Sequence, residues 1–378
     1  MNIAILGQGT IGSGVLELAQ KSEDICVKRV LEKRFKTELT CGTIEEIVSD
    51  PEIELVSETM GGLHPAYEFA EAVLQSGKHF VTANKLLVCE KGPELQALAE
   101  EKGVAFLYSA ACGGGIPYLS NMKQAACVDR LTALGGILNG TTNYILDAMT
   151  TGGSEYDDAL KKAQELGYAE RDPSGDVDGL DTMRKLVLAC GVGFGARIEP
   201  EDVAVCGISA VSARDIAFAR AHGYVIRLCA TAQRWSEVTA AWVEPCFKAV
   251  DSPEASVRKN LNRAWYKGEA MGELSFGGQG AGKLPTAANV LRDIRSVMAG
   301  ERSMLNVPLT SVKPDNNWAT HAYYLRTPLK AEVPNMWVAI SEADEQYRYT
   351  ITEPVSVKEM HRLYKKEPDS FFAALDEQ

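Results

Sequence analysis

The sequence predicts an α/β protein whose first third forms a doubly wound parallel sheet. Short apolar runs, each followed by a polar or glycine-rich turn, recur along this part of the chain at 3–6, 25–31, 54–60, 78–83 and 104–108. Helical patterns separate the later runs, as at 66–75 and 94–101. Strands that alternate with helices are typical of a parallel sheet with helices on both faces.

The first run leads into a glycine-rich turn, Gly7-Gln8-Gly9-Thr10-Ile11-Gly12, and then into a helix-like segment. Gly7 permits the tight turn, Gly9 lets backbone approach a pyrophosphate, and Gly12 lets the helix pack on the strand. The helix N-terminus at Thr10 and Ile11 offers N–H groups and the positive end of a dipole to phosphates. The order strand, turn, helix therefore predicts a Rossmann-type dinucleotide site.

The second apolar run ends in Glu32-Lys33-Arg34, about 20 residues beyond the glycines, where the ribose is read. An acid at this place usually holds the ribose 2′-hydroxyl of NAD, whereas bases accommodate the 2′-phosphate of NADP. An acid and two bases are both present here. Because two bases follow one acid, NADP is favoured and NAD remains the alternative.

Candidate ligand loops follow the carboxyl ends of the later strands. They are Gly61-Gly62, the segment from Thr82 to Lys85, and Gly113-Gly114-Gly115-Ile116-Pro117. Lys85 comes directly after a buried-looking strand, where a cation can face the cofactor. Taken alone, it could equally be a surface lysine at the start of a loop.

The segment 163–189 is rich in charge from Glu165 to Lys185 and then runs directly into the apolar residues Leu186 to Ala189, which a solvated loop rarely does. We expect a helix to end at Gly167 and turns to occupy 172–175. A new helix is expected to begin near Asp178 or Gly179.

On that new helix Asp181 and Lys185 are four residues apart, so they lie on one face and can pair. Glu170 and Asp176 come from the loop just before. Two interpretations compete. The pair is either a surface ion pair of a few tenths of a kcal/mol, or part of a group of acids and a lysine that binds a substrate carrying an amino group.

Composition restricts the class of protein. The 378 residues are 46% hydrophobic and 24% charged, enough for two or three domains. Fifty-one acids against 39 bases give a net charge of −12, which argues against nucleic acid or an anionic membrane as partner. No apolar run approaches a membrane span, and the N-terminus is typical of a strand rather than a signal peptide. Nine scattered cysteines without a Cys-x-x-Cys favour reduced thiols and the cytoplasm.

Long and unusual strings, including the glycine turn, recur over roughly residues 1–300. They are Gly7 to Gly14, Val81-Thr82-Ala83-Asn84-Lys85, Gly114-Gly115-Ile116-Pro117, Gly136 to Leu146, Leu166-Gly167-Tyr168-Ala169-Glu170, Asp172-Pro173, Asp176-Val177, Gly179, Asp181, Lys185-Leu186, Gly280-Ala281-Gly282 and Pro285-Thr286-Ala287. On these strings the chain resembles the homoserine dehydrogenase family.

The resemblance implies an NAD(P)-dependent oxidoreductase that interconverts L-homoserine and L-aspartate 4-semialdehyde in the aspartate pathway, which leads to threonine and methionine. It also implies a homodimer or dimer-based oligomer. In this family the position of Lys185 is the proton donor in reduction, and that of Lys85 lies beside the nicotinamide and the reacting oxygen. Asp181 would orient Lys185, and a second lysine nearby would lower its pKa.

The remaining site residues are also carried over by resemblance. The positions of Glu170 and Asp181 bind the amino acid, and that of Asp176 shapes the pocket. Gly167 and Gly280 match backbone positions near the cofactor.

Two departures from the family pattern stand out. The family usually has a glutamate before the glycine-proline turn that, with nearby carbonyls, holds a sodium ion. Here Ser109 stands in its place, so the ion is in doubt even if the carbonyls of Cys112, Gly114 and Ile116 point inward.

The C-terminal region departs as well. The usual proline-glycine helix start of an ACT regulatory domain is absent after Arg326, so a divergent ACT-like remnant without threonine feedback is expected. We predict strands at 338–340 and 347–351 and a helix at 357–364.

The predicted domains are a dinucleotide-binding domain at 1–115 with a returning helix near 284–305, an α/β catalytic and dimerisation domain at 116–283, and a small α+β appendage at 306–378. Two alternatives to a homoserine dehydrogenase stay open. One is a diverged relative that performs the same hydride chemistry on another amino-acid aldehyde or alcohol. The other is a catalytically silent cofactor-binding regulator, which the four residues Lys85, Glu170, Asp181 and Lys185 disfavour.

Overall fold

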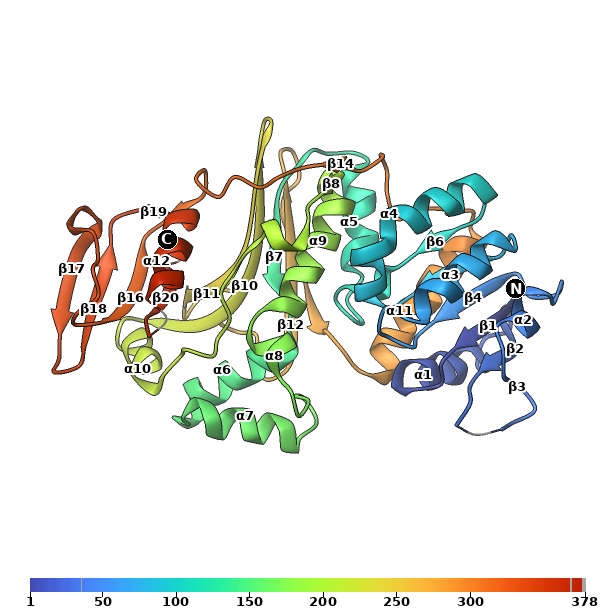
Figure 1. The fold of residues 1–378 in the computed structure, drawn as a ribbon, viewed down its shortest axis with the longest axis horizontal. Coiled ribbons are helices and arrows are strands. Elements are labelled where there is room, and N and C mark those ends of the chain that lie inside the picture. The colour runs from blue at the N-terminus through green and yellow to red at the C-terminus, as the bar shows by residue number, and fades with distance from the viewer. Residues whose placement is uncertain (35, 368, 376–378) are drawn as a thin grey trace. The chain divides into compact units, whose positions relative to one another are not determined.

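The computed structural model describes residues 1–34, 36–367 and 369–375. Its contacts divide the chain into two compact units (Figure 1). Unit 1 contains 1–129, 191–196 and 278–310, and unit 2 contains the described residues of 130–190, 197–277 and 311–378. The predicted boundaries at 115, 283 and 306 stay a prediction.

Unit 1 is built on a parallel sheet of six strands in the order β3-β2-β1-β4-β5-β6. The strands are β1 (Asn2–Leu6), β2 (Cys26–Leu31), β3 (Thr40–Cys41), β4 (Leu55–Glu58), β5 (His79–Thr82) and β6 (Phe106–Leu107). This is the strand order of a dinucleotide-binding fold, with the order reversing between β1 and β4. The predicted doubly wound sheet is confirmed, and the two-residue β3 is the strand that the sequence pattern missed.

The helices of unit 1 connect and cover these strands (Figure 1). They are α1 (Thr10–Ala19), α2 (Glu45–Val48), α3 (Ala66–Gln75), α4 (Lys85–Lys102), the short η1 (Ser109–Ala111), α5 (Tyr118–Ala126) and α11 (Lys283–Met298). Helix α11 returns to pack on α1, where a Cβ on Gly14 would lie 2.7 Å from the Lys283 carbonyl oxygen. The glycine therefore allows the two helices to approach closely.

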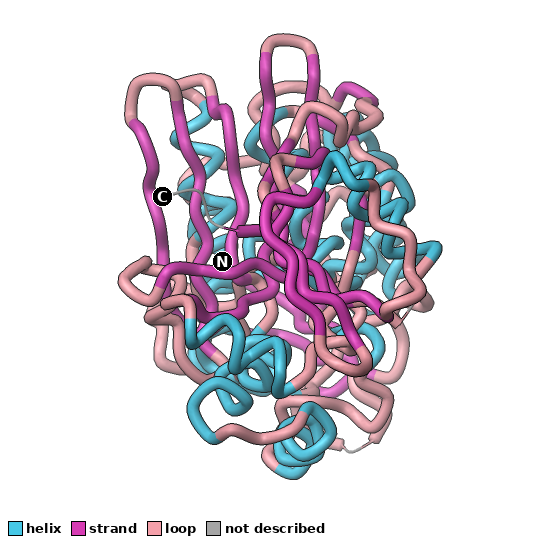
Figure 2. The backbone as a smooth tube through the Cα atoms, turned by 90° about the vertical axis from the view of Figure 1, so that its left-hand side faces the viewer, coloured by secondary structure: helices cyan, strands magenta, loops and turns pink. Residues whose placement is uncertain are grey.

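Unit 2 contains a ten-stranded sheet in the order β13-β12-β7-β10-β11-β20-β16-β18-β17, with β9 paired to β11. The strands are β7 (Leu131–Ile137), β9 (Ala204–Val205), β10 (Tyr224–Trp235), β11 (Val238–Ala249), β12 (Leu261–Gly268), β13 (Gly272–Gln279), β16 (Tyr323–Pro328), β17 (Val338–Ala343), β18 (Tyr347–Thr352) and β20 (Phe371–Leu375). Strand β20 pairs with β11, so the C-terminal strands continue the same sheet. Figure 2 turns the C-terminal part of the chain toward the viewer and draws its strands in magenta.

The described helices that lie wholly or mostly in unit 2 are α6 (Gly140–Gly152), α7 (Tyr156–Glu165), α8 (Ser174–Val177), α9 (Leu180–Phe194), η2 (Pro200–Asp202), α10 (Ala213–Ala221), η3 (Asn335–Trp337) and α12 (Val357–Lys366). Helices α6 and α10 contact β10 and each other. The short strands β8 (Ala196–Arg197), β14 (Thr310–Ser311), β15 (Thr320–His321) and β19 (Val355–Ser356) complete the elements. The predicted C-terminal strands and helix are confirmed as β17, β18 and α12.

One local prediction around the charge-rich stretch needs correction, because the segment expected to form only turns contains the one-turn helix α8. The next helix, α9, begins at Leu180, near the predicted start at Asp178 or Gly179. Gly179 has φ +84°, so it breaks the helical path between α8 and α9.

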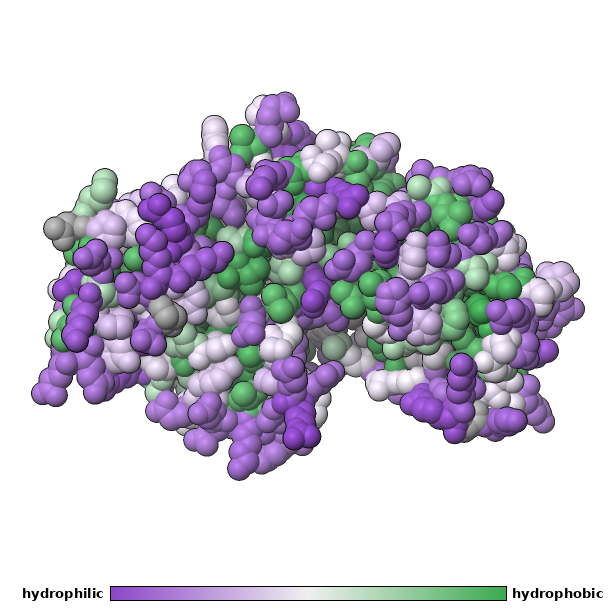
Figure 3. Space-filling model, in the orientation of Figure 1, coloured by the Kyte–Doolittle hydropathy of each residue, from purple (hydrophilic) through white to green (hydrophobic). Residues whose placement is uncertain are grey.

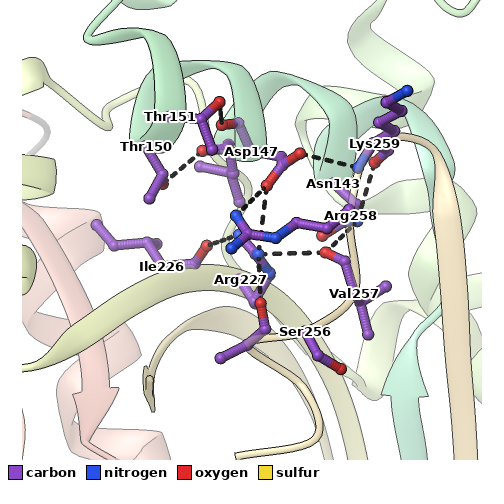
Figure 4. Close-up of polar contacts among 12 residues, drawn as sticks. Asn143, Asp147, Thr150, Thr151, Ile226, Arg227, Ser256, Val257, Arg258 and Lys259 are labelled. Atoms are coloured by element: carbon purple, nitrogen blue, oxygen red, sulfur yellow. Dashed lines mark hydrogen bonds and ion pairs between the residues drawn. The ribbon is translucent and has the colours of Figure 1, made fainter. Parts of the chain in front are cut away.

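A buried charge cluster ties the loop before β12 to α6 and β10 (Figure 4). The guanidinium of Arg227 is fully buried and donates to the carbonyls of Ala255 and Val257 at 3.1 and 3.2 Å. The carboxylate of Asp147 lies 3.7 Å from it and accepts hydrogen bonds from Arg258 Nη1 and the Lys259 N–H at 3.0 and 2.9 Å. These contacts hold the loop in one place on the helix.

The surface of the face drawn in Figure 3 is covered mainly by hydrophilic residues. Within the described ranges, every helix is too short or too polar to pass through a bilayer.

Candidate active site

The glycine turn of unit 1 has the geometry that a pyrophosphate requires. Gly7 has φ +84°, and a Cβ on Gly12 would lie only 2.0 Å from the Gly7 carbonyl oxygen. Around Gly9 a Cβ would meet nothing within 4 Å, so the backbone is open on that side. Helix α1 starts at Thr10 and has no side-chain cap. Its first N–H groups, including that of Ile11, therefore suit the phosphates of a dinucleotide.

The carboxylate of Glu32 lies next to this turn. It accepts a hydrogen bond from the Gln8 N–H at 3.3 Å, and its side chain is only 6% exposed. Arg34 donates to it through Nε and Nη2 at 2.9 and 2.6 Å. These bonds, followed by those of the Arg34, Gln8 and Lys33 N–H groups, lower the pKa of Glu32 to about 2. The acid and one base of the predicted ribose site thus form a pair beside the glycines.

The end of β5 forms a second part of unit 1's site. Thr82 is buried, and its hydroxyl donates to Glu58 at 2.5 Å and accepts from the Asn84 N–H at 2.9 Å. Asn84 caps α4 by accepting from the Leu87 N–H at 3.1 Å, which places the partly buried Lys85 in the first turn of the helix. Lys85 therefore starts a helix rather than a loop.

Sequence reasoning missed Glu58, a fully buried carboxylate at the end of β4. Burial raises its pKa above the ordinary range, while bonds from Thr82 and the Met60 and Gly61 N–H groups act in the opposite direction. A polar residue that ends an apolar strand was the available signal.

In unit 2, Asp181 and Lys185 pair along α9 with their atoms 2.7 Å apart, and each side chain is about one-tenth exposed. The Lys185 ammonium also donates to the Leu138 carbonyl at 2.6 Å. The pair is therefore nearly buried, which separates it from an ordinary surface ion pair.

Asn139 joins this pair to Asp176, a connection that the sequence did not suggest. Its Nδ2 donates to Asp176 at 2.6 Å and to Asp181 at 2.9 Å, while its Oδ1 caps α6 by accepting from the Thr142 N–H at 2.8 Å. Burial raises the pKa of Asp176, the Asn139 bond lowers it, and the charge of Asp181 raises it again. Two acids, an amide and an ammonium thus meet at the N-termini of α6 and α9.

Glu170 and Gly167 lie in the loop after α7. Gly167 has φ +75° and ends that helix, as predicted. Glu170 is exposed, and its backbone carbonyl accepts from Gln164 at 3.0 Å. Within the residues that the structure describes, the Glu170 carboxylate has no hydrogen-bonding or ion-pairing partner, so the protein alone does not draw it into the Asp181–Lys185 cluster.

Comparison with known proteins places the chain in a family. The family model described as homoserine dehydrogenase matches 117–294, and that described as homoserine dehydrogenase, NAD binding domain, matches 7–109. The homoserine dehydrogenase of Synechocystis is 42% identical over 317 residues, 79% of this chain and 73% of the relative. That of Bacillus subtilis is 37% identical over 319 residues, 80% and 74% of the two chains. The chain belongs to the homoserine dehydrogenase family.

Solved structures of the family agree. A homoserine dehydrogenase from Thiobacillus denitrificans superimposes with a TM-score of 0.89 at 29% identity, covering 100% of this chain and 98% of that one. The comparisons confirm the predicted homoserine dehydrogenase function and fold, and with them an NAD(P)-dependent oxidoreductase that acts on a hydroxyl group.

The residues that the family resemblance assigns to a sodium ion lie in unit 1. Ser109 is fully buried in η1, and its hydroxyl contacts the Met304 sulfur at 3.5 Å. Gly114 approaches Gly280 so closely that a Cβ on Gly114 would lie 2.4 Å from Gly280. Among the residues with defined positions, no group of three or more His, Cys, Asp or Glu side chains could hold a metal ion.

Proposed function

We propose that this homoserine dehydrogenase interconverts L-homoserine and L-aspartate 4-semialdehyde, with Lys185 as the proton donor in reduction. The observation that supports the proposal is the nearly buried Lys185, fixed by Asp181 at 2.7 Å and by the Leu138 carbonyl at 2.6 Å. A lysine held from two sides has few rotamers left, so its ammonium is positioned before substrate arrives.

The chemistry needs a proton at one oxygen. In reduction the aldehyde oxygen becomes an alkoxide, and the Lys185 ammonium gives it a proton. In oxidation the amine of Lys185 takes that proton back. Asp181 orients the Lys185 side chain in both directions, and Lys85 is the second lysine that we assign to the reacting oxygen.

Three acids serve the amino-acid end of the substrate. Asn139 donates to both Asp176 and Asp181, so negative charge gathers where Asp181 is buried and Asp176 is half-buried. The exposed Glu170 carboxylate is available to bind the substrate ammonium from the loop after α7. The family resemblance and this charge distribution both support our assignment of substrate-binding roles to Glu170, Asp176 and Asp181.

The residues of the glycine turn fit a dinucleotide, which supplies or accepts the hydride when it is bound. We assign its pyrophosphate to Gly7, Gly9, Thr10, Ile11 and Gly12, and backbone near it to Thr82, Gly167 and Gly280. Lys33 and the exposed Arg34 favour NADP, because both can face a 2′-phosphate while Glu32 holds Arg34 in place.

The purified protein with L-homoserine and NADP, and then with NAD, tests this function through the absorbance of the reduced nicotinamide. We expect turnover with both cofactors and a higher kcat/KM with NADP. Turnover only with another amino-acid alcohol would contradict the substrate assignment.

Three wider assignments are part of the proposal. The chain acts as a homodimer or dimer-based oligomer, works in the cytoplasm, and serves the aspartate pathway toward threonine and methionine. They rest on the family resemblance and, for the cytoplasm, on nine cysteines in a pattern typical of reduced thiols. Light scattering of the purified protein would measure the oligomer size.

A further inference from the structure

Three backbone carbonyls around the glycine-proline turn converge on one side-chain amide. Asn289 Nδ2 in α11 donates to the Gly114 carbonyl at 2.8 Å, to that of Ile116 at 3.2 Å and to that of Ser109 at 3.4 Å. Asn289 is fully buried. Its Oδ1 accepts from Arg292 Nη1, so the amide is oriented with its N–H groups toward the carbonyls.

These are the carbonyls on which a sodium ion would depend. Gly114 and Ile116 are two of the three oxygens expected from the sequence, and Ser109 stands where the family places its glutamate. A hard cation needs the lone pairs of such oxygens. The Asn289 amide stands at the point where these oxygens converge and donates hydrogen bonds to them. The amide and a cation therefore cannot occupy this place together, and the residues present do not fit the ion.

We propose that the Asn289 side-chain amide replaces the monovalent cation, so that this chain holds its glycine-proline turn without a bound ion. The amide N–H groups present partial positive charge to the carbonyls, as a cation would, but the residue is neutral. Ser109 agrees with a neutral occupant. A bound ion would need a carboxylate ligand to offset its charge, whereas Ser109 at that position is neutral.

The charges around the cluster agree with a neutral occupant. The Asp293 carboxylate, the acid in contact with Ser109, accepts the Ser109 N–H at 2.7 Å. The Ser109 hydroxyl is directed to the sulfur of Met304. On the other side of the amide, Arg292 adds positive charge, which opposes a cation. Because Asp293 already accepts from Ser109, an ion at the three carbonyls would be buried without a carboxylate ligand of its own, which would be costly.

A second asparagine provides a matched control. Asn143 in α6 is also fully buried and donates through Nδ2 to three carbonyls, those of Val257, Lys259 and Leu261, at 3.1, 2.9 and 3.2 Å (Figure 4). Two arginines, Arg227 and Arg258, lie beside this loop against the single carboxylate of Asp147, so the net positive charge should make its carbonyls reject a cation even when the amide is removed.

The experiment compares Tm in NaCl, KCl and choline chloride at equal ionic strength, together with the sodium NMR linewidth, for the wild type, Asn289→Ala and Asn143→Ala. We expect the wild type to have the same Tm in all three salts and to leave the sodium linewidth unchanged. Asn289→Ala should melt several degrees lower in choline chloride and regain part of that loss in NaCl. Asn143→Ala should melt lower by the same amount in every salt.

A wild-type Tm that rises in NaCl over choline chloride, or a wild-type protein that broadens the sodium signal and loses this effect in Asn289→Ala, would overturn the proposal. An Asn289→Ala protein whose Tm is the same in all salts would also overturn it, because the freed carbonyls would then not bind a cation. If Asn289→Ala does not fold, the smaller change Asn289→Ser, which leaves a hydroxyl and room for an ion, takes its place with the same expectations.

Discussion

Lys185 and Asp181 form a nearly buried ion pair one helical turn apart, with Nζ and Oδ2 separated by 2.7 Å. The same ammonium bonds to the Leu138 carbonyl, so it is fixed from the helix and from the end of β7. An exposed pair of this spacing contributes a few tenths of a kcal/mol. Here the burial of the pair and the bond to the Leu138 carbonyl hold the Lys185 ammonium in a position suited to proton transfer.

The first prediction concerns the proton donor. Lys185→Ala should lower kcat by about 10² or more, with little change in cofactor affinity, because only the transition state needs the proton. Steady-state rates and cofactor titration measure the two effects. Lys162→Ala, which breaks the exposed Lys162–Glu165 pair on α7, is the control and should leave kcat unchanged. Normal turnover in Lys185→Ala would make Lys185 a structural residue.

The second prediction concerns Asn139. Asn139→Ala removes the cap of α6, at a cost of about 1 kcal/mol, and leaves Asp176 and Asp181 without their shared donor. Both stability and kcat/KM should fall. Ser356→Ala removes the cap of α12 and should reduce stability alone. If Asn139→Ala and Ser356→Ala have the same kcat/KM, the role of Asn139 is limited to capping α6.

The third prediction concerns the substrate ammonium. Glu170→Gln should raise KM for homoserine roughly tenfold, since a hydrogen bond to a charged group contributes about 1.5–3 kcal/mol. The side chain is exposed and makes no bond to the described protein, so Tm should not change. A variant with normal KM would show that Asp176 and Asp181 bind the amine without it.

The fourth prediction concerns cofactor choice. Replacing Lys33 and Arg34 together by Ala should weaken NADP much more than NAD, because a paired base contributes to binding the 2′-phosphate dianion. Affinities for the two cofactors are measured by fluorescence titration. In the control Glu32→Gln, NAD should be the cofactor that loses affinity. Equal losses in the double variant would instead assign the ribose site to Glu32 alone.

The fifth prediction concerns pH. Burial raises the pKa of Asp176 in the folded protein above its ordinary 3.8. The folded state therefore binds more protons than the unfolded state between 3.8 and the raised value, and stability falls as pH rises through that window. The Asp176→Asn variant has no carboxyl at this position and does not lose stability in this way. The difference between its Tm and that of the wild type should therefore increase as pH rises above 3.8.

Asp172 is the control for the pH experiment. The Ser174 hydroxyl and N–H lower its pKa, so its contribution is present above 3.8 and is lost as pH falls. The Tm of Asp172→Asn relative to the wild type should accordingly decrease as pH rises. The same trend in both variants would contradict the assigned direction for Asp176.

Some features of this protein were readable from the sequence because they depend on neighbours along the chain. The glycine turn needs only the conformations of a few adjacent residues, so strand, turn and helix were placed correctly at β1 and α1. The Asp181–Lys185 pair follows from helical spacing of four residues. The family resemblance added the function, which the comparisons confirm, and the roles of single residues, which the variants above test.

Other features were decided only by the tertiary structure, because they join distant segments. Asn139 bonds to acids 37 and 42 residues away, and sequence spacing does not show which loop faces which helix. Asn289 reaches carbonyls 173 to 180 residues earlier. Hydrogen bonds need their atoms within about 3 Å, and only the packing of α11 against the glycine-proline turn brings this amide that close. The family resemblance pointed to Ser109 as the residue in place of an expected glutamate, and the fold showed which side-chain amide lies near it.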